Sequence, residues 1–473
     1  MNKALKKDFT EGPMFLRMLL FALPIMLTGV LQIAYNMADN IVVGQFSGDD
    51  YALAAVGSTS SLTNLVLNLL LGVAAGTGVV VAQRYGAKDY GAVSKTVHTA
   101  LSFSGVAGVA VMLIGLIISE PVLTLMGTKA EVLDNAVLYF RIICVGIPAS
   151  SVYNFGGSVL RSVGDSKTPL IILGTSGILN VALNLFFVIT LHMSVAGVAL
   201  ATIISQYASA LAVMLVLYIR RTECYGFRPR ELRFHKASLL AILRFGIPAG
   251  IQGCMFSISN VFITSAMNSF PTPDAVLANT IANNIDAISL TVMNAFTQAA
   301  LTFTGQNFGA GKHDRVRRVL LLALLQVLVI GVAITQLELF FGEELIMLYI
   351  SKDAQNKEAV IAITMDIITL LLNTFFLCGI LDVMSGSLRG IGYSISPMLV
   401  NIIGICGVRI LWIFAFFPMD MFNTPTGLMM SYPISWSLSI VAMAVIRVIA
   451  EVRVRKRLKA LADNKNCAPA VAE

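Results

Sequence analysis

The sequence has 473 residues, of which 57% are hydrophobic and 12% are charged, and its mean hydropathy is +0.81. Soluble proteins carry about 25% charged residues, so this composition excludes a soluble globular fold and indicates a polytopic membrane protein. The formal net charge of +7 could suit nucleic acid, but the basic residues lie in short connections between apolar runs. We therefore expect a lipid bilayer around the protein and no nucleic-acid partner.

The first apolar run, residues 14–43, contains Gln32, Tyr35, Asn36 and Asp39 before it is complete. About 20 apolar residues suffice to cross a bilayer, so these polar groups are expected at membrane depth, and we take Gln32, Tyr35 and Asn36 as candidate cavity residues. A carboxylate there costs roughly 2.5–3.5 kcal/mol on insertion scales and usually serves a function. Asp39 can reduce that cost by binding a proton or a cation, which predicts a switchable ion site. The alternative is a structural acid at the membrane surface or one hydrogen-bonded to Tyr35 and Asn36.

Apolar runs of similar length recur along the chain at nearly even spacing. Only helices or closed barrels can cross hydrocarbon, and these runs lack the alternation of barrel strands. We therefore expect an all-α membrane protein with about twelve transmembrane helices. The expected spans are 14–43, 53–80, 95–119, 133–157, 168–190, 195–219, 240–269, 276–303, 314–337, 358–385, 395–417 and 425–448. Residues 1–9 lack the apolar segment and cleavage site of a signal peptide, so the first span should remain as an anchor.

Several further ionisable residues fall within later spans, and three of them could face the cavity. Asp286 and Asp366 lie well inside 276–303 and 358–385, and Arg409 lies inside 395–417. Intramembrane charges either line a transport cavity or pair with one another. We take all three as candidate cavity residues, and a structural ion pair involving Arg409 is the alternative.

The basic residues are concentrated in every second connection, around 84–95, 161–167, 220–236 and 312–318 and after 447. The alternate connections contain only Lys129, Lys352 and Lys357, among several acidic residues. The positive-inside rule then predicts a multi-pass protein of the cytoplasmic membrane with both termini in the cytoplasm.

Internal repeats divide the spans six and six about the longest basic connection, 220–237. Six spans is an even number, so both halves enter the membrane from the same side, and the repeats are parallel. We expect an N-lobe (1–219), a linker (220–237), a C-lobe (238–450) and a cytoplasmic tail (451–473) without regular structure. The matching segments are 21–24 (FALP) with 245–248 (FGIP), 82–87 (AQRYGA) with 305–310 (GQNFGA), and 160–169 (LRSVGDSKTP) with 388–397 (LRGIGYSISP).

Motifs for catalysis, metal clusters or cofactors are not found in the sequence. The six cysteines occur singly, the four histidines do not form H-E-x-x-H, and there is no G-x-S-x-G nucleophile elbow. The G-x-x-x-G at residues 72–76 predicts close helix packing rather than a ligand site. We expect a protein that is not an enzyme and needs no cofactor other than a coupling ion.

With these motifs, the chain from about 15 to 449 resembles the multidrug and toxic compound extrusion (MATE) family. The resemblance rests on Tyr35-Asn36-x-x-Asp39, the two Gln-x-aromatic-Gly-Ala loops and the two Leu-Arg-x-x-Gly-x-Ser-x-x-Pro turns. It implies a two-lobe antiporter that expels organic cations in exchange for sodium ions or protons.

The resemblance is closer to the DinF-like branch than to the NorM-like branch. In the DinF-like branch a cation site uses residues that match Asp39, Asn180, Asn184 and Thr202 here. Position 184 carries an Asp in that branch, so its Asn here implies weaker sodium binding. The NorM-like branch uses an acid on the seventh helix, whereas residues 246–270 contain none.

From the residues alone, Asn180 and Asn184 are spaced i, i+4 and share one helix face. Such a pair could equally serve as interhelical glue, worth about 0.6 kcal/mol per hydrogen bond.

The resulting hypothesis is a monomeric secondary antiporter that exports amphipathic organic compounds, chiefly small organic cations, by alternating access of its two lobes. The alternative within the same superfamily is a lipid-linked saccharide flippase. A flippase cavity should be rich in Arg to hold pyrophosphate, and apart from basic residues at span ends only Arg141 and Arg409 lie inside the expected spans. A membrane-embedded enzyme, the third class, would need a convergent catalytic set, which the sequence lacks.

Overall fold

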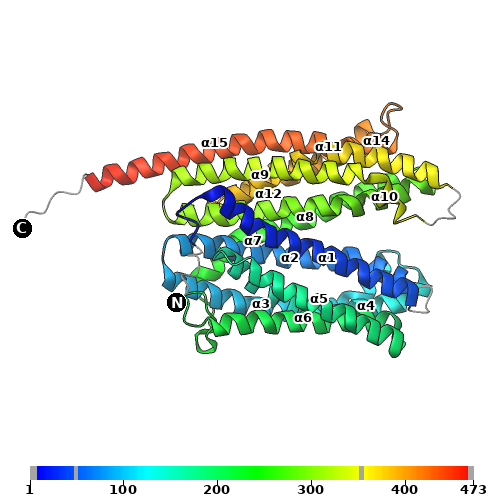
Figure 1. Ribbon diagram of the computed structural model, residues 1–473, viewed down its shortest axis with the longest axis horizontal. Helices are drawn as coiled ribbons and strands as arrows, with labels where there is room; N and C mark the ends of the chain where they lie inside the picture. Colours follow the sequence, from blue (N-terminus) through cyan, green and yellow to red (C-terminus); the bar gives the residue numbers. More distant parts are fainter. Residues whose placement is uncertain (1–7, 47–51, 351–355, 467–473) are drawn as a thin grey trace, which may run out of the picture.

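The computed structural model describes residues 8–46, 52–350 and 356–466, and over these ranges the regular structure is helical (Figure 1). This confirms the predicted all-α fold. The helices of the first half are α1 (Met14–Phe46), α2 (Ala52–Gly86), α3 (Tyr90–Leu125), α4 (Ala130–Ser162), α5 (Lys167–Leu185) with its π-helical continuation η1 (Phe186–Thr190), and α6 (Ser194–Ile219).

The second half repeats this order with more interruptions. One short element of the connection between the halves is the 3-10 turn η2 (Pro229–Glu231). The helices that follow are α7 (Lys236–Met267), α8 (Pro273–Gly309), α9 (His313–Phe340), α10 (Gly342–Met347), α11 (Lys357–Gly390), α12 (Ile395–Asn401), η3 (Ile402–Gly407), α13 (Val408–Leu411), η4 (Trp412–Phe416), α14 (Pro425–Met429) and α15 (Ser431–Asn466).

Eleven helical segments in the described ranges are, by length and composition, long and apolar enough to cross a membrane. The long helix that falls short of this criterion is α8, which carries Asn279, Asn283, Asn284 and Asp286. Its neighbours α1, α2, α9 and α11 pack around it, and Asn279 is buried. Protein rather than lipid therefore covers much of α8, and with it the described helices make up the expected set of about twelve.

The last helix extends beyond the expected end of its span. We expected a tail without regular structure from residue 451, whereas α15 remains helical to Asn466. The Nε of Arg447 lies 3.1 Å from Oε1 of Glu451, one turn further on. The segment is rich in Arg, Lys, Ala and Leu, which are strong helix formers, and it contains no Gly or Pro to interrupt the helix.

The start of α1 and the end of α15 lie at the same end of the helix bundle. In Figure 1, α1 begins and α15 ends on the left. The connections at this end, 87–89, 163–166, 220–235, 310–312 and 391–394, carry or adjoin most of the basic residues. We call it the basic end, and the other end the opposite end.

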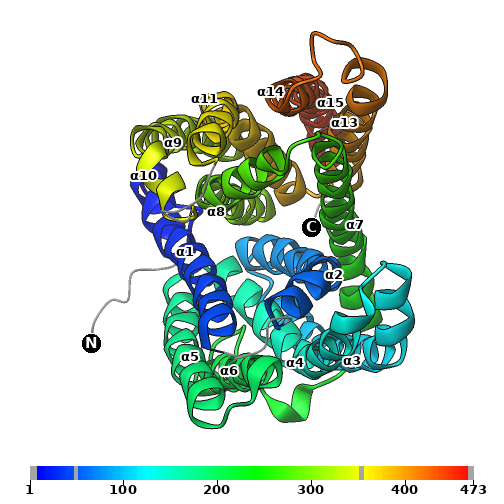
Figure 2. The same ribbon diagram turned by 90° about the vertical axis from the view of Figure 1, so that its right-hand side faces the viewer.

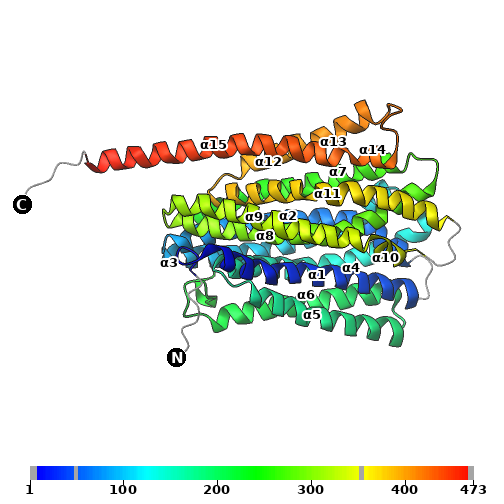
Figure 3. The same cartoon turned by 45° about the horizontal axis from the view of Figure 1, so that its top comes forward.

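The helices form two lobes, α1–α6 and α7–α15, which meet through α1, α2, α7 and α8 (Figure 2). α2 packs on α7 and α8, and α1 packs on α8. Gly72 and Gly76 of the predicted packing motif face α7, where a Cβ on Gly72 would lie 2.1 Å from the nitrogen of Gly250. The oblique view in Figure 3 shows the same long helices running between the two ends of the molecule.

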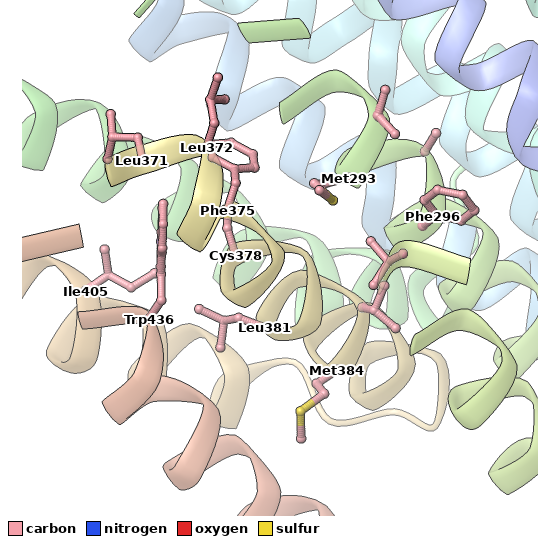
Figure 4. Close-up of a cluster of buried hydrophobic side chains, with 14 of the residues drawn as sticks. Met293, Phe296, Leu371, Leu372, Phe375, Cys378, Leu381, Met384, Ile405 and Trp436 are labelled. Atoms are coloured by element: carbon pink, nitrogen blue, oxygen red, sulfur yellow. The ribbon is translucent and has the colours of Figure 1, made fainter. Parts of the chain in front are cut away.

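The first helix of each repeat, α1 or α7, contributes side chains to a hydrophobic core of the other lobe. The largest buried core, part of which Figure 4 shows around Met293 and Phe375, lies in the second lobe. Met18 and Phe21 from the first half of α1 belong to it, whereas Val42 and Val43 from the second half pack with α5–α6. α7 is arranged in the same way, since Ile242 joins a core of the first lobe. Each of these helices thus anchors one lobe to the other.

Candidate functional site

The four residues of the predicted ion site come together in the first lobe. Asn184 donates a hydrogen bond from Nδ2 to Oδ1 of Asp39 and lies 3.3 Å from Oδ1 of Asn180. Asn180 in turn reaches Oγ1 of Thr202 at 3.5 Å. Three helices, α1, α5 and α6, therefore contribute to one connected polar cluster.

Local packing explains why α1 approaches α5 at this point. The ring of Tyr35 lies directly against Gly177, where a Cβ would come within 1.7 Å of the ring. The Tyr35 hydroxyl donates to the carbonyl of Gly174 at 3.1 Å. Because Gly174 and Gly177 of α5 have no side chains, α1 can approach closely at this crossing. Asp39, one turn further along α1 than Tyr35, then meets Asn184.

Burial makes this cluster sensitive to charge. The side chains of Asn184 and Asn180 are 0% and 5% exposed. Oδ1 of Asn184 has no hydrogen-bond partner among the described residues. A carboxylate in such a place must be paired, hydrogen-bonded or neutralised. One carboxylate with neutral amide and hydroxyl neighbours can be neutralised by one proton or one monovalent cation.

A cavity of about 600 Å³ opens beside this cluster, between α1, α2, α4, α5 and α6. Its volume falls in the range of about 300–1,000 Å³ that is typical of small-molecule sites. Gln32, Asn36 and Asp39 of the sequence prediction line it, together with Thr202. Among the lining residues in the described part of the chain, Asp39 is the only charged one.

The sequence analysis missed most of the cavity wall. The lining residues that it did not identify include Thr59, Ser60, Thr63, Asn64 and Asn68 of α2, Tyr139, Ser150, Tyr153 and Asn154 of α4, and Gln206 and Ser209 of α6. On α2 a signal was present, because Ser60, Asn64 and Asn68 recur every four residues within an apolar span and so share one face. Tyr139 and Tyr153 add aromatic residues to the wall, and aromatic rings are a group that attracts organic cations.

Four predicted cavity residues do not line this cavity in the described structure: Tyr35, Asp366, Asp286 and Arg409. Tyr35 faces α5, as described above, and is not among the cavity-lining residues. Asp366 is exposed on α11 of the second lobe. The position of a residue along a span predicts its depth in the membrane. The direction in which its side chain points depends on which helices pack beside that span.

Asp286 and Arg409 both lie in the second lobe, inside its helix bundle. The Arg409 side chain is 1% exposed, its guanidinium lies 3.7 Å from the Tyr432 ring centroid, and it reaches Oδ1 of Asn260 at 3.5 Å. Asp286 interacts electrostatically with Arg409 and with Glu338.

Glu338 is a buried acid that the sequence analysis missed because the expected span ended one residue earlier. Its Oε2 accepts a hydrogen bond from Ser289 at 2.6 Å. Within residues 8–46, 52–350 and 356–466, no group of three or more His, Cys, Asp or Glu side chains could hold a metal ion.

Comparison with known proteins adds a family match to this geometry. The family model described as MatE matches residues 24–186 and 248–415. The chain is 28% identical over 399 residues to the probable multidrug resistance protein YoeA of Bacillus subtilis (strain 168), covering 83% of this chain and 85% of the relative. It is also 27% identical over 397 residues to the probable multidrug resistance protein NorM of Thermotoga maritima, covering 82% of each.

Solved structures share the fold over almost the whole chain. A crystal structure of MATE in complex with MaL6 has a TM-score of 0.87 at 21% identity, covering 97% of this chain and 100% of that chain. An outward-facing conformation of a multidrug resistance MATE family transporter has a TM-score of 0.86 at 20% identity, covering 96% and 100%. At these identities the similarity establishes the two-lobe helical fold.

Proposed function

This chain belongs to the MatE family of membrane transporters, and we propose that it is a secondary active antiporter of the cytoplasmic membrane. It exports amphipathic organic compounds, chiefly small organic cations, in exchange for protons or sodium ions. The relatives named as multidrug resistance proteins support drug export, and family membership makes it a transporter rather than an enzyme.

The observation that carries the proposal is that one carboxylate, that of Asp39, is the only charged group among the described residues that line the cavity. Asp39 lines the cavity and is hydrogen-bonded to the buried Asn184. A proton, a sodium ion or an organic cation can each neutralise this carboxylate, but two of them together would leave a buried excess positive charge, which is costly. Competition for one carboxylate converts an inward ion gradient into outward movement of a cation.

Alternating access supplies the movement. We assign 1–219 to the N-lobe, 220–237 to the linker, 238–450 to the C-lobe and 451–473 to the tail, with the basic end in the cytoplasm. The two lobes of one monomer then rock about the contacts of α1, α2, α7 and α8.

The proton is favoured over sodium as the working ion. The amide of Asn184 presents its Nδ2 donor, not its oxygen, to Asp39. A proton needs only the carboxylate itself, whereas a sodium ion between Asp39 and Asn184 would need an amide oxygen in place of the Nδ2 donor. This arrangement, with no acid in 246–270, supports a mechanism closer to the DinF-like branch.

The flippase alternative is less well supported. A pyrophosphate group requires Arg or Lys, and none is found among the described residues that line the cavity. Asp39 would repel such an anion. Arg141 lies between α3 and α4, where it contacts Ser119 and Glu120, and Arg409 lies in the second lobe.

The test is transport by the purified protein in proteoliposomes loaded with a fluorescent lipophilic cation. A proton gradient or a sodium gradient is imposed separately, and each is collapsed by a selective ionophore as a control. We expect the proton gradient to drive movement of the dye. Dye movement that neither gradient changes, in vesicles shown to hold their gradients, would refute antiport.

A further inference from the structure

Two glutamines of the repeated loops form matching contacts between the lobes at the basic end. Nε2 of Gln83, near the end of α2, donates to the carbonyl of Gly390 at 2.8 Å. Nε2 of Gln306, near the end of α8, donates to the carbonyl of Ser162 at the same distance. Each contact joins a helix of one lobe to a helix of the other.

The four residues occupy equivalent positions of the two repeats. Gln83 and Gln306 are the glutamines of the AQRYGA and GQNFGA loops, and Ser162 and Gly390 follow Leu-Arg in the two repeated turns. Ser162 and Gly390 are also the last residues of α4 and α11. Carbonyls at helix C-termini have no intrahelical partner, so each glutamine satisfies an acceptor that its own lobe leaves unpaired.

The backbones of α2 and α8 touch at the same place. A Cβ on Gly86 would lie 2.0 Å from the carbonyl oxygen of Gln306, and one on Gly309 would lie 1.9 Å from that of Gln83. A Cβ on Gly305 would meet the side chain of Ala82 at 2.9 Å. The glycines of the repeated loops therefore allow the contact that brings the glutamines within reach of the opposite lobe.

We propose that Gln83–Gly390 and Gln306–Ser162 form a reciprocal glutamine latch that holds the basic end closed and must release before the cavity can open there. This inference rests on the proposed function, because the latch needs to release only if the transporter works by alternating access. Both bonds cross the same interface, where α2 and α8 touch, so separation of the lobes that breaks one half of the latch should favour opening of the other.

The bonds nearby support a closed state at this end. Arg84, next to Gln83, donates to Ser238 of α7 at 2.8 Å. Oε1 of Gln306 accepts from the backbone of Phe9 at 3.0 Å, and Phe9 stacks on Phe303 at 3.9 Å between ring centroids. The segment before α1 therefore lies against one half of the latch.

Amide hydrogen exchange of the full-length protein in lipid nanodiscs tests the latch without substrate or ion gradient. The variants are Gln83→Ala and Gln306→Glu, since Glu keeps the acceptor for Phe9 but loses the donor for Ser162. We expect exchange in 158–166 and 386–394 to rise about two- to tenfold, the range of one net hydrogen bond, while helix ends at the opposite end become more protected. Gln336→Ala is the matched control, because Nε2 of Gln336 bonds Asn373 within the second lobe.

A second variant tests the contact between α2 and α8 by adding a methyl group where the two backbones touch. Gly86→Ala should shift exchange in the same direction, and Gly57→Ala, where a Cβ meets nothing within 4 Å, should not.

Unchanged exchange at both ends in the glutamine variants, or a rise confined to the substituted segment, would overturn the latch. Such a result with normal dye transport would refute the latch alone. The expected exchange shifts without any gradient-driven transport would instead refute the proposed antiport.

Discussion

At the residue scale, Asp39 and Asn184 determine the charge of the proposed ion site in the first lobe. Asp39 supplies one carboxylate, and Asn184, at 0% exposure, adds a neutral amide instead of a second acid. The charge of the site therefore changes by one unit when a single proton or cation binds. Two predictions follow from this charge.

Asp39→Asn should abolish gradient-driven export, because an amide cannot alternate between charged and neutral forms. The fold should be retained, with the free energy of unfolding changed by less than about 1 kcal/mol, since removing a buried charge offsets the weaker hydrogen bond from Asn184 to a neutral amide oxygen. Dye transport in proteoliposomes and thermal unfolding in detergent measure the two effects. Asp366→Asn, the same change at an exposed position, is the control, and full transport by Asp39→Asn at normal abundance would exclude a coupling role.

Sodium and protons should compete for the Asp39 site. Cation binding needs the ionised carboxylate, so apparent sodium affinity should rise with pH, at most about tenfold per pH unit, and then level off. Asn184→Asp should strengthen sodium binding, because it adds a charged oxygen ligand.

Calorimetric titration of sodium at several pH values measures both effects. Asn154→Asp, which adds an acid elsewhere on the cavity wall, is the matched control. A sodium affinity that is the same at every pH and is unmoved by Asn184→Asp would contradict the shared site.

At the scale of elements, α2 serves two functions at different levels along its length. Ser60, Asn64 and Asn68 point toward the cavity, whereas Gly72 and Gly76 lie against α7. One helix thus lines the proposed substrate site and forms part of the interface about which the lobes are proposed to move.

Gly72→Ala should destabilise the protein, because the new methyl would lie 2.1 Å from the backbone of Gly250. Overpacking of this kind costs about 1–3 kcal/mol. Denaturant unfolding in mixed micelles measures it. On the same helix, Gly57→Ala has open space and should be neutral or stabilising, because Ala is the better helix former. Equal stabilities of the two variants would show that the α2–α7 contact is looser than described.

At the scale of the whole molecule, the parallel repeats place equivalent parts of both lobes at the same end. The basic connections all lie at the end where α1 begins and α15 ends (Figure 1). The ion cluster and cavity lie in the half of the first lobe nearer the opposite end. The latch therefore closes the end away from the proposed ion site.

Reporter fusions check the orientation of this arrangement. Fusions after Glu120, His192 and Glu344 should be extracytoplasmic, and those after Arg220 and Lys459 cytoplasmic, because Lys and Arg are retained on the cytoplasmic side. Alkaline phosphatase and a fluorescent protein report the two sides. A cytoplasmic reporter at Glu344, with Arg220 also inside, would contradict the division into six and six spans.

The sequence by itself was sufficient to predict the helical class, about twelve spans and the parallel repeats, and it singled out Asp39, whereas the grouping of Asn180, Asn184 and Thr202 with Asp39 came from the family resemblance. These features are local or periodic: an apolar run long enough to span, a charge count per connection, a repeated loop, and polar groups one turn apart. The i, i+4 spacing of Asn180 and Asn184 indicates a shared face wherever that face points.

Only the tertiary structure decided which faces meet. Asp366 is outside the cavity, Glu338 contacts Ser289, and the first half of α1 packs in the core of the opposite lobe. In a membrane, lipid-facing and protein-facing surfaces are both apolar, so hydrophobic pattern cannot distinguish them. Close approach at small residues such as Gly86 and Gly177, which depends on the partner helix as much as on the helix itself, determines the neighbours.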